Sequence, residues 1–320
     1  MTEAAPVWSF PAAPEQALDV LGLGEISLDQ VARLPHFPGW ASKLAMTSWE
    51  EHPGGQMATA LLTCARLGLR TRLLGSVGDD DAGRRALAPL REAGVALDGV
   101  RVRPGIRSRG AMILVDEASG ERTVLWHRVA ELVLSADEIA PEEIQRARLL
   151  MVDASDLERS VWAASEARAL GLPVIIDVDS MDPDPSALLA NATFPIVPES
   201  FADALGGVDA ALADLTRRGA LLPVVTQGER GAVGLWKGQR LEARARTVRV
   251  VDTTGAGDVF HGAFAWGLLA GYGPEQLLHV ANAAAGMSCR ANGAQGDIPS
   301  LSRLEGFLAA ADRPIGGDGR

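Results

Sequence analysis

A glycine-rich turn that ends in an aspartate stands late in the chain, between an apolar run and a helical pattern. The sequence VVDTTGAGDVFHGAF spans 250–264, and large apolar residues recur at helical spacing after the turn. The turn is therefore predicted to be a helix N-terminus, where backbone N–H groups lack helical partners and the dipole adds partial positive charge. The N–H groups of Gly255, Ala256, Gly257 and Asp258 would form an anion site there, because the two glycines let the backbone approach a phosphate closely.

Asp258 follows this turn and is a candidate general base. A carboxylate among anion-binding amides repels the phosphate that they bind, and a magnesium ion on a nucleotide would offset that repulsion. Facing an alcohol, Asp258 could take the hydroxyl proton as the oxygen attacks phosphorus. The residues alone also allow Asp258 to be a helix cap that complements the dipole. Both interpretations stay open at this point.

Two familiar nucleotide-binding patterns are excluded. Gly22 and Gly24 lack the third glycine of a dinucleotide fingerprint, because Ser27 stands there and the next residues are typical of a strand. A P-loop is excluded because neither lysine of the chain, Lys43 or Lys237, follows a glycine. ATP would have to be held differently.

The elements that must position the turn alternate between strand and helix. Apolar runs predict strands at 18–24, 72–77, 149–153, 173–177 and 222–226, and amphipathic runs predict helices at 58–68, 82–93, 158–170, 256–270 and 275–290. Such alternation predicts an α/β fold with a mostly parallel sheet covered on both faces. Two β-rich stretches, about 26–50 and 105–128, are expected to pair as a small lid. The folded domain is expected over 18–315, after a loose lead-in at 1–17.

Composition excludes several classes of protein. The 320 residues are 47% hydrophobic, enough for a large core, and a net charge of −11 without a basic stripe argues against nucleic-acid binding. Cys64 and Cys289 form no ligand cluster, which argues against structural zinc and a disulfide scaffold. No apolar stretch reaches the length of a membrane span, and no lysine or arginine precedes Arg33, as a secretory signal requires. A cytoplasmic protein without membrane partners is expected.

The motif DTTGAGD at 252–258 resembles the C-terminal signature of the ribokinase/PfkB carbohydrate kinase family. Upstream, PGGQMATALLTCARLG at 53–68, followed by GSVGDDDAG at 75–83, is similar to the N-terminal signature of that family. Within the family, VTQG at 225–228 and the late glycine motif resemble the branch that includes sulfofructose kinase. The resemblance implies a ribokinase-like three-layer α/β sandwich with a small β lid. It further implies a kinase that uses ATP and Mg²⁺ to phosphorylate a hydroxyl of a small sugar or sugar derivative.

The resemblance also assigns roles to single residues. It makes Asp258 the base and Gly255, Ala256 and Gly257 the anion hole. The sugar-binding residues that it implies are Asp29, Gly54, Gly55, Gln56 and Thr59. The residues that it implies on the nucleotide side are Glu199, Thr226, Gly228 and Asn282. A monovalent cation site, suited to K⁺, would be formed by Asp252, Thr254 and Gly293.

Two positions depart from the family pattern. Thr59 stands where the family has asparagine, so a hydroxyl replaces an amide and the sugar selectivity is expected to differ. Glu199 to Ala202, ESFA, stands where the family has Asn-x-x-Glu, so the second acid that helps to organise phosphate and magnesium is missing. Glu199 itself or the nearby Asp203 could compensate.

Two alternative functions follow from the same residues. A nucleoside kinase of the same family would stack an aromatic base, but one tyrosine and seven phenylalanines offer few partners. A sugar-binding regulator without turnover would explain the missing acid at Ala202, but the intact Asp258 argues against it.

Further charged residues near the predicted site allow two interpretations each. Arg107, Arg109 and Arg128 could meet an anionic sugar substituent, or they could be solvated surface residues. His261 lies one helical turn after Asp258 and is expected to be a packed or capping residue. Open edges of the lid strands predict a homodimer through the lid.

Overall fold

This computed structural model describes residues 8, 10, 18–119, 122–127 and 129–311. Its main feature is a nine-stranded sheet with strands β1 (Leu18–Leu23), β4 (Thr71–Gly78), β5 (Val100–Arg103), β8 (Ala147–Asp153), β9 (Val174–Asp177), β10 (Phe194–Pro198), β11 (Val224–Thr226), β12 (Ala232–Trp236) and β13 (Gln239–Ala243). The spatial order is β13-β12-β11-β10-β9-β8-β1-β4-β5. All neighbours from β5 to β11 run parallel, and β12 and β13 extend the sheet as an antiparallel ribbon.

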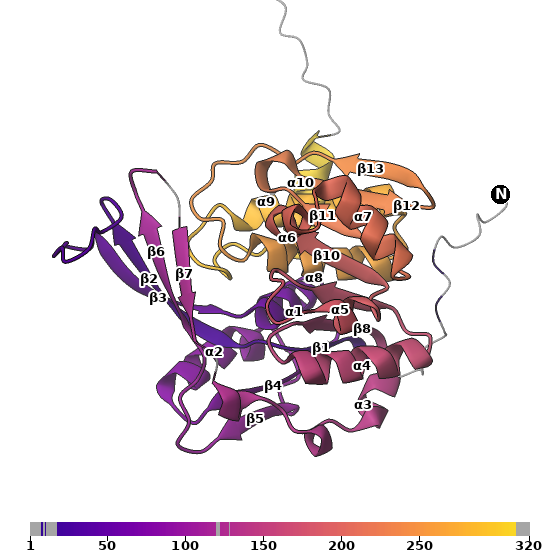
Figure 1. Cartoon of the computed structure of the whole chain (residues 1–320), viewed down its shortest axis with the longest axis horizontal. Coiled ribbons are helices and arrows are strands. Elements are labelled where there is room, and N and C mark those ends of the chain that lie inside the picture. The colour runs from indigo at the N-terminus through magenta and orange to yellow at the C-terminus, as the bar shows by residue number, and fades with distance from the viewer. Residues whose placement is uncertain (1–7, 9, 11–17, 120–121, 128, 312–320) are drawn as a thin grey trace, which may run out of the picture.

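Helices cover both faces of this sheet, so the body has three layers (Figure 1). One face carries α1 (Gln56–Arg66), α2 (Asp81–Glu92), α8 (Ala256–Leu269), α9 (Pro274–Ser288) and α10 (Leu301–Ala311). The other face carries α3 (Pro141–Gln145), α4 (Leu157–Ala169), α5 (Ser186–Leu189), α6 (Glu199–Ala204) and α7 (Val208–Arg217). The central strands contribute side chains to both helical layers. In β8, for example, Met151 packs on the first face while Leu150 and Val152 pack on the second.

A second sheet forms the lid that stands beside the body (Figure 1). Its strands are β2 (Ser27–Leu34), β3 (Ser48–Gly54), β6 (Ala111–Asp116) and β7 (Arg122–Trp126), in the order β3-β2-β6-β7. The β2–β6 pair is parallel, whereas β3 and β7 join antiparallel at the two edges. The chain enters this sheet from β1 through β2, returns to the body after β3, and enters the sheet again at β6 before leaving it after β7. Because β2 follows β1 directly, the lid lies at the end of the large sheet where β1 finishes.

The predicted fold class is confirmed, with a mostly parallel sheet, helices on both faces and a small β lid. All ten predicted strands and helices are present within a few residues; the first helix, for example, begins at Gln56 rather than at residue 58. Several observed elements were not predicted from the sequence, namely β5, β10, β12, β13, α3, α5, α6, α7 and α10. None of the helices in the described ranges has the length and apolar character that crossing a bilayer requires.

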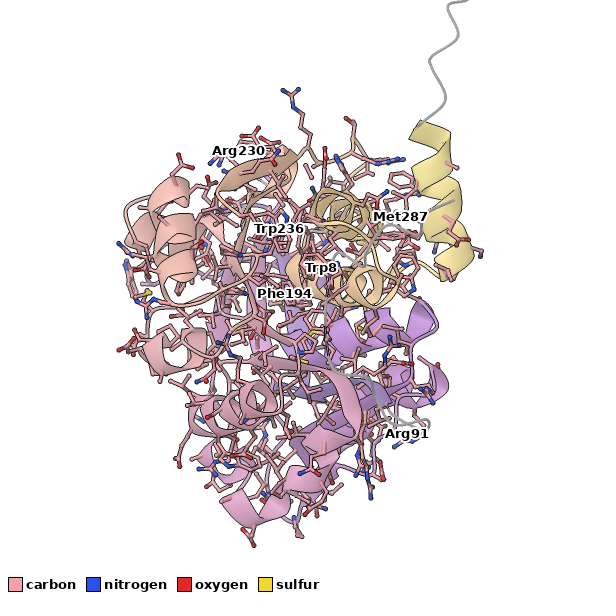
Figure 2. The ribbon with its side chains drawn as sticks, turned by 90° about the vertical axis from the view of Figure 1, so that its right-hand side faces the viewer. Trp8, Arg91, Phe194, Arg230, Trp236 and Met287 are labelled. Atoms are coloured by element: carbon pink, nitrogen blue, oxygen red, sulfur yellow. The ribbon has the colours of Figure 1, made fainter. Side chains whose placement is uncertain are left out.

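The N-terminal lead-in differs from its prediction at its two described residues, because Phe10 packs against Phe194 and Trp8 lies in the core. Trp8 is 8% exposed, and its ring packs edge-on against Phe194 and Trp236 in the core, as Figure 2 shows. Its indole Nε1 donates a hydrogen bond to the Tyr272 carbonyl at 2.6 Å. Trp8 is therefore part of the core, whereas most of 1–17 lies outside the described residues, as does the predicted end of the domain at residue 315.

Candidate active site

A cavity of about 410 Å³ lies between the lid and the carboxyl ends of the central strands. This is the edge of an open parallel sheet at which ligands bind, because helix N-termini and strand ends meet there. From the body, the cavity is lined by Glu25, Gly55, Gln56, Ala154, Ser155, Asp179, Ser180, Asp182, Pro183, Thr254, Gly255, Asp258 and Ala294. From the lid and its connections, it is lined by Ser27, Asp29, Arg109, Gly110, Ala111, Ile113, Arg122, Val124, Trp126 and His127.

The glycine loop begins helix α8 at the floor of this cavity. Gly255 is the N-cap and adopts the left-handed conformation, with φ 75° and ψ 0°. A Cβ at this position would lie 2.6 Å from the Cα of Ala294, so both the conformation and the space require glycine. At Gly257, by contrast, a Cβ would meet nothing within 4 Å, so the first turn of α8 is open on that side. The Ala256 N–H donates to the Thr253 carbonyl at 3.3 Å, whereas the N–H groups of Gly255 and Gly257 are donors that this helix N-terminus offers to an anion.

Asp258 stands in the first turn of α8 and lines the cavity. Burial raises the pKa of its carboxyl well above the usual range, and the neighbouring carboxylates of Asp177 and Asp179 raise it further. Like charges this close cannot all ionise at low cost, so Asp258 holds its proton to a higher pH than an exposed aspartate. A carboxylate of raised basicity is what a proton acceptor needs.

A buried pair lies beneath Asp258. His261 is 3% exposed, and its Nδ1 lies 3.6 Å from Oδ2 of Asp177 and 2.8 Å from the carbonyl oxygen of Gly257. Burial lowers the pKa of His261, so the ring is neutral at physiological pH. The sequence-based prediction of a packed histidine agrees with this placement, and His261 lines no part of the cavity.

The acceptor side of the cavity is built around Asp29. Its Oδ1 accepts a hydrogen bond from the Ala111 backbone N–H at 3.0 Å. A Cβ at Gly54 would lie 2.2 Å from its Oδ2, and a Cβ at Gly55 would lie 2.5 Å from the Glu25 carbonyl. The glycine pair therefore makes room for the Asp29 carboxylate and for the β1–β2 connection. Gly54 is therefore needed to keep that carboxylate at the cavity.

Two further polar side chains complete the acceptor side. Gln56 donates from Nε2 to Oδ2 of Asp179 at 3.3 Å, so the first residue of α1 is linked to the loop after β9. Burial raises the pKa of Glu25 to about 7, and the nearby Asp153 carboxylate contributes, while Arg109 opposes the shift. The cavity thus collects more carboxylates than the sequence analysis singled out.

The three residues predicted to hold a monovalent cation do come together. Oδ1 of Asp252 accepts from the N–H and the hydroxyl of Thr254, at 2.9 and 2.8 Å, and Oδ2 accepts from the Gly293 N–H at 2.9 Å. Burial alone would raise the pKa of Asp252, but these hydrogen bonds and the nearby Arg33 hold it below its usual range. The carboxylate is therefore ionised beside the glycine loop.

The residues predicted to bind the nucleotide lie around the ends of β10 and β11. Glu199 begins α6, and its carboxylate accepts from Gln227 Nε2 at 2.8 Å and from Arg230. Thr226 ends β11, and Gly228 begins the short turn that follows. The hydrogen bond from Gln227, and then that from Arg230, lowers the pKa of Glu199. Glu199 therefore links the start of α6 to the turn that follows β11.

The structure does not bring Thr59 or Asn282 to the cavity. Thr59 is fully buried one turn into α1, where its hydroxyl accepts from Gln295 Nε2 at 3.3 Å. Asn282 is 7% exposed in α9 and donates from Nδ2 to the Ala243 carbonyl at 2.7 Å. Both side chains are held by the fold in these positions, so substrate contact by either would require rearrangement. Asp203, the other proposed substitute for the missing acid, lies exposed on α6.

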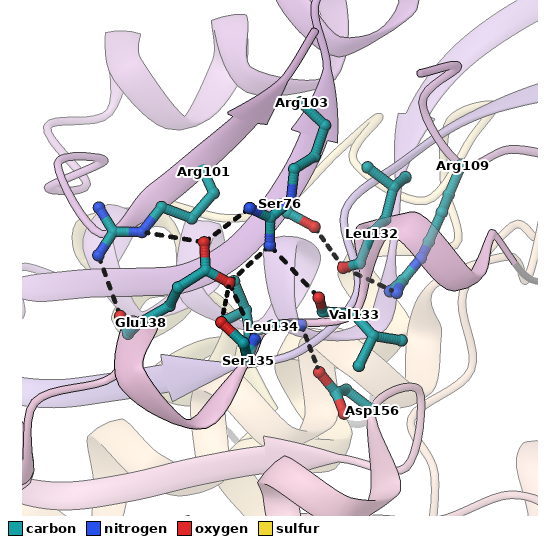
Figure 3. A network of polar contacts seen from close by, with 10 residues as sticks. All are labelled: Ser76, Arg101, Arg103, Arg109, Leu132, Val133, Leu134, Ser135, Glu138 and Asp156. Atoms are coloured by element: carbon teal, nitrogen blue, oxygen red, sulfur yellow. Dashed lines mark hydrogen bonds and ion pairs between the residues drawn. The ribbon is translucent and has the colours of Figure 1, made fainter. Parts of the chain in front are cut away.

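The base of the lid is fastened to the large sheet by the segment that follows β7 (Figure 3). The Leu132 carbonyl accepts hydrogen bonds from Arg109 Nη2, at 3.3 Å, and from the Ser76 hydroxyl of β4. Glu138 receives both terminal nitrogens of Arg103 at 2.6 Å, and this fork lowers the pKa of Glu138 to about 2. The lid is therefore anchored at its base by a network of polar contacts.

The three arginines considered as partners of an anionic sugar substituent lie in different surroundings. Arg109 is 8% exposed and donates to the Leu132 carbonyl, so it is a buried residue rather than a solvated surface residue. Arg107 is exposed and lines a larger hollow of about 700 Å³ that lies against the other face of the lid, formed by Leu28, Met112 and Leu125. Arg128 lies outside the described residues. The chemistry concentrates in the smaller cavity because Asp258 and the glycine loop line only that one.

The fold brings together further functional candidates that were not predicted from the sequence. Glu25 follows β1, Asp153 ends β8, and Asp177 ends β9, and these three strands are neighbours in the large sheet. An acid directly after each apolar strand was the available signal. Arg122 of the lid was also missed, although it lines the cavity with Asp258.

An α/β body whose β lid covers a glycine loop and a carboxylate defines a phosphotransferase of the small-molecule kinase class. The family model described as pfkB family carbohydrate kinase matches residues 18–301. The chain therefore belongs to the pfkB family, and it is an ATP-dependent carbohydrate kinase.

Individual relatives agree with this assignment. The chain is 26% identical over 291 residues to the ribokinase of Bacillus subtilis, covering 90% of this chain and 98% of that protein. A putative ribokinase from Agrobacterium tumefaciens superposes with a TM-score of 0.83 at 28% identity and covers 93% of this chain and all of its own. The ribokinase of Arabidopsis thaliana, solved with ribose and ATP, has a TM-score of 0.81 at 23% identity, covering 91% of this chain and 99% of that one. At this identity, the likeness to the Arabidopsis ribokinase shows the fold alone.

Proposed function

We propose that this kinase transfers the γ-phosphoryl group of ATP to a hydroxyl of a small sugar or sugar derivative, with Asp258 as the base. The observation that carries the proposal is the shared cavity, in which Asp258 and the glycine loop of α8 lie opposite Asp29. One end offers amides for a phosphate, and the other offers a carboxylate for hydroxyl groups. The ribose and ATP bound to the Arabidopsis ribokinase support this division.

The proposed step moves one phosphoryl group and one proton. The acceptor oxygen forms a bond to the γ-phosphorus while the bond from that phosphorus to the bridging β,γ-oxygen breaks, and ADP leaves with the electron pair. The proton of the hydroxyl passes to the carboxylate of Asp258. The N–H groups at Gly255, Ala256 and Gly257 hold the migrating group and stabilise its charge.

The carboxylates of the site are suited to Mg²⁺ that arrives with the nucleotide. Among the described residues, no group of three or more histidine, cysteine or acidic side chains forms a metal site of its own. Mg²⁺ typically keeps several waters and takes one or two carboxylates plus substrate phosphates, which the acids around Asp258 can provide. When bound, Mg²⁺ neutralises phosphate charge. For K⁺, we propose the loop formed by Asp252, Thr254 and Gly293, whose ionised carboxylate suits a hard cation.

A nucleoside is a second candidate for the acceptor, and one observation favours it. Ile113, Val124 and Trp126 line the lid side of the cavity and present an apolar surface on the same sheet as Asp29. A flat base could pack against such a surface, and so could the C–H face of a sugar. Nothing favours a regulator without turnover.

The test is a panel of sugars, sugar acids, sulfosugars and nucleosides, with ADP release measured in the presence of Mg²⁺ and ATP. We expect at least one sugar to give ADP release in proportion to phosphorylated product. Release with nucleosides alone would favour the second acceptor class. Binding of a panel member without any ADP release would contradict the proposed function.

Replacing Asp29 with asparagine is expected to raise the KM of the acceptor by about 10- to 100-fold, the range that a hydrogen bond to a charged group covers. Asparagine can still accept from the Ala111 N–H, but its amide accepts less strongly from sugar hydroxyls. The KM of ATP should stay within about twofold. Steady-state kinetics with each substrate varied in turn provides the measurement.

The matched control for Asp29 is Asp116→Asn, at the far end of the lid. Asp116 accepts a hydrogen bond from the Ala118 N–H and does not line the cavity. Replacing its carboxylate should therefore leave both KM values unchanged. If Asp29→Asn and Asp116→Asn have the same kinetics, Asp29 does not bind the acceptor.

A further inference from the structure

Two arginines of the lid reach across to the loops that flank the anion hole. Arg122, at the start of β7, donates from Nη1 to the hydroxyl of Thr253 at 2.5 Å. Arg33, in β2, donates from Nη2 to Oδ1 of Asn292 at 2.9 Å. Thr253 lies two residues before Gly255. Asn292 lies two residues before Ala294, which packs against Gly255. The lid therefore touches both loops through guanidinium groups.

Only one of these two arginines lines the cavity. Alternate residues of β7, Arg122, Val124 and Trp126, face it, because successive side chains of a strand point to opposite sides. Figure 1 shows β7 as the lid strand on the side of the large sheet. Arg122 thus lies over the mouth of the cavity near the glycine loop, whereas Arg33 is absent from the lining residues.

Arg122 is also free to engage a ligand. Arg122 is exposed, and the hydrogen bond that the described residues give its guanidinium goes to the neutral hydroxyl of Thr253. The other arginine of the cavity, Arg109, is buried, bonded to the Leu132 carbonyl and electrostatically coupled to Glu25. Arg122 is therefore the available fixed cation at the glycine-loop end of the cavity.

The charge of the site requires such a cation. Five carboxylates line the cavity, namely Glu25, Asp29, Asp179, Asp182 and Asp258. A nucleoside triphosphate adds several more negative charges beside them, and the helix N-terminus supplies only about half a positive charge. A guanidinium offers planar, paired N–H donors that match phosphoryl oxygens, and it stays charged at any physiological pH.

We propose that Arg122 leaves Thr253 on substrate binding and contacts the phosphoryl group in transfer, as a catalytic residue supplied by the lid. This inference rests on the proposed kinase function and adds to it. Because the charge of the migrating group spreads over its outer oxygens in the transition state, a guanidinium there stabilises the transition state more than the ground state. The placement of Arg122 depends on the lid, so transfer is favoured when the lid is closed and water is excluded.

The test compares Arg122→Ala and Arg122→Lys with Arg33→Ala in the full-length protein. Arg33→Ala is the matched control, because it also removes one hydrogen bond between the lid and a flanking loop. We expect Arg122→Ala to lower kcat by about 50-fold, as loss of one hydrogen bond to a charged group does, with KM for the acceptor nearly unchanged. Arg122→Lys should recover part of the loss, and Arg33→Ala should stay within about threefold of the wild type.

A second measurement separates transition-state contact from lid anchoring. Mg²⁺·ADP with aluminium fluoride mimics the migrating phosphoryl group, and its affinity, with D-ribose present, is compared with that of Mg²⁺·ADP alone. We expect Arg122→Ala to lose most of the extra affinity that fluoride gives the wild type, while ADP binding changes by less than about threefold. Thermal unfolding of each variant verifies that the fold is intact.

Several outcomes would overturn the inference. If Arg122→Ala and Arg33→Ala lower kcat equally, Arg122 only anchors the lid. If Arg122→Ala raises the acceptor KM alone, the guanidinium binds the acceptor instead. If the wild type releases no ADP with any acceptor, the kinase function fails as well, whereas an active wild type with an equally active Arg122→Ala variant rejects the inference alone.

Discussion

Replacing Asp258 with asparagine is expected to lower kcat by about 1000-fold, within the range that general-base catalysis contributes. The amide keeps the shape of the side chain but cannot accept the proton of the attacking hydroxyl. Both KM values should change by less than about threefold, because the amides of the glycine loop and Asp29 remain. Initial rates of ADP release at saturating substrates measure the effect.

Stability provides the control for this variant, and its sign follows from the raised pKa of Asp258. A carboxyl whose folded pKa exceeds its unfolded pKa stabilises the fold fully below the unfolded value, and that contribution is lost as pH rises through the folded value. Asparagine stays neutral at every pH, so the Asp258→Asn variant avoids this loss of stability and should have a higher Tm than the wild type at pH 8. Near pH 4 the difference should shrink. A kcat close to the wild type, or a lower Tm at pH 8, would contradict the assignment.

The same pKa shift predicts the acid limb of the wild-type pH profile. Because burial and the charges of Asp177 and Asp179 keep Asp258 protonated to a higher pH, kcat/KM of the free enzyme should rise with pH well above the ordinary aspartate range. The limb should be absent from the residual activity of Asp258→Asn. A wild-type rate that is flat down to about pH 4 would exclude Asp258 as the titrating base.

Much of the fold was predictable because its central elements carry strong local patterns. Strands such as β1 and β8 are mostly apolar runs, and α1 and α8 show helical spacing. The strand β10 was missed because FPIVP contains two prolines, which usually exclude a central strand, yet it lies between two parallel neighbours. Tertiary pairing overrides the local preference there.

The active site was predictable where it is contiguous in sequence and not where the fold assembles it. The glycine loop and Asp258 form one motif, so their roles follow from local chemistry. The grouping of Glu25, Asp153 and Asp177 depends on strand order, because neighbours in the sheet are far apart in the chain. The orientation of Thr59 likewise follows from how α1 packs, which no motif specifies.

Replacing Gly255 with alanine is expected to lower kcat by about 300-fold and to destabilise the fold. Alanine in the left-handed conformation costs about 1–2 kcal/mol, and its Cβ would also lie 2.6 Å from the Cα of Ala294. The loop must shift to relieve this contact, so the amides of α8 move away from the phosphoryl position, and losing one such donor costs about 10²–10³ in kcat.

The matched control is Gly271→Ala, just after the other end of α8. Gly271 also has a positive φ, 82°, but a Cβ there would meet nothing within 4 Å. This variant should therefore lose the same conformational energy, about 1–2 kcal/mol, and keep its kcat within about twofold. Thermal unfolding and initial rates on both variants separate backbone strain from crowding at the anion hole. Equal kcat values for the two variants would show that the position of the Gly255 loop does not limit phosphoryl transfer, because the strain is common to both and only the contact with Ala294 differs.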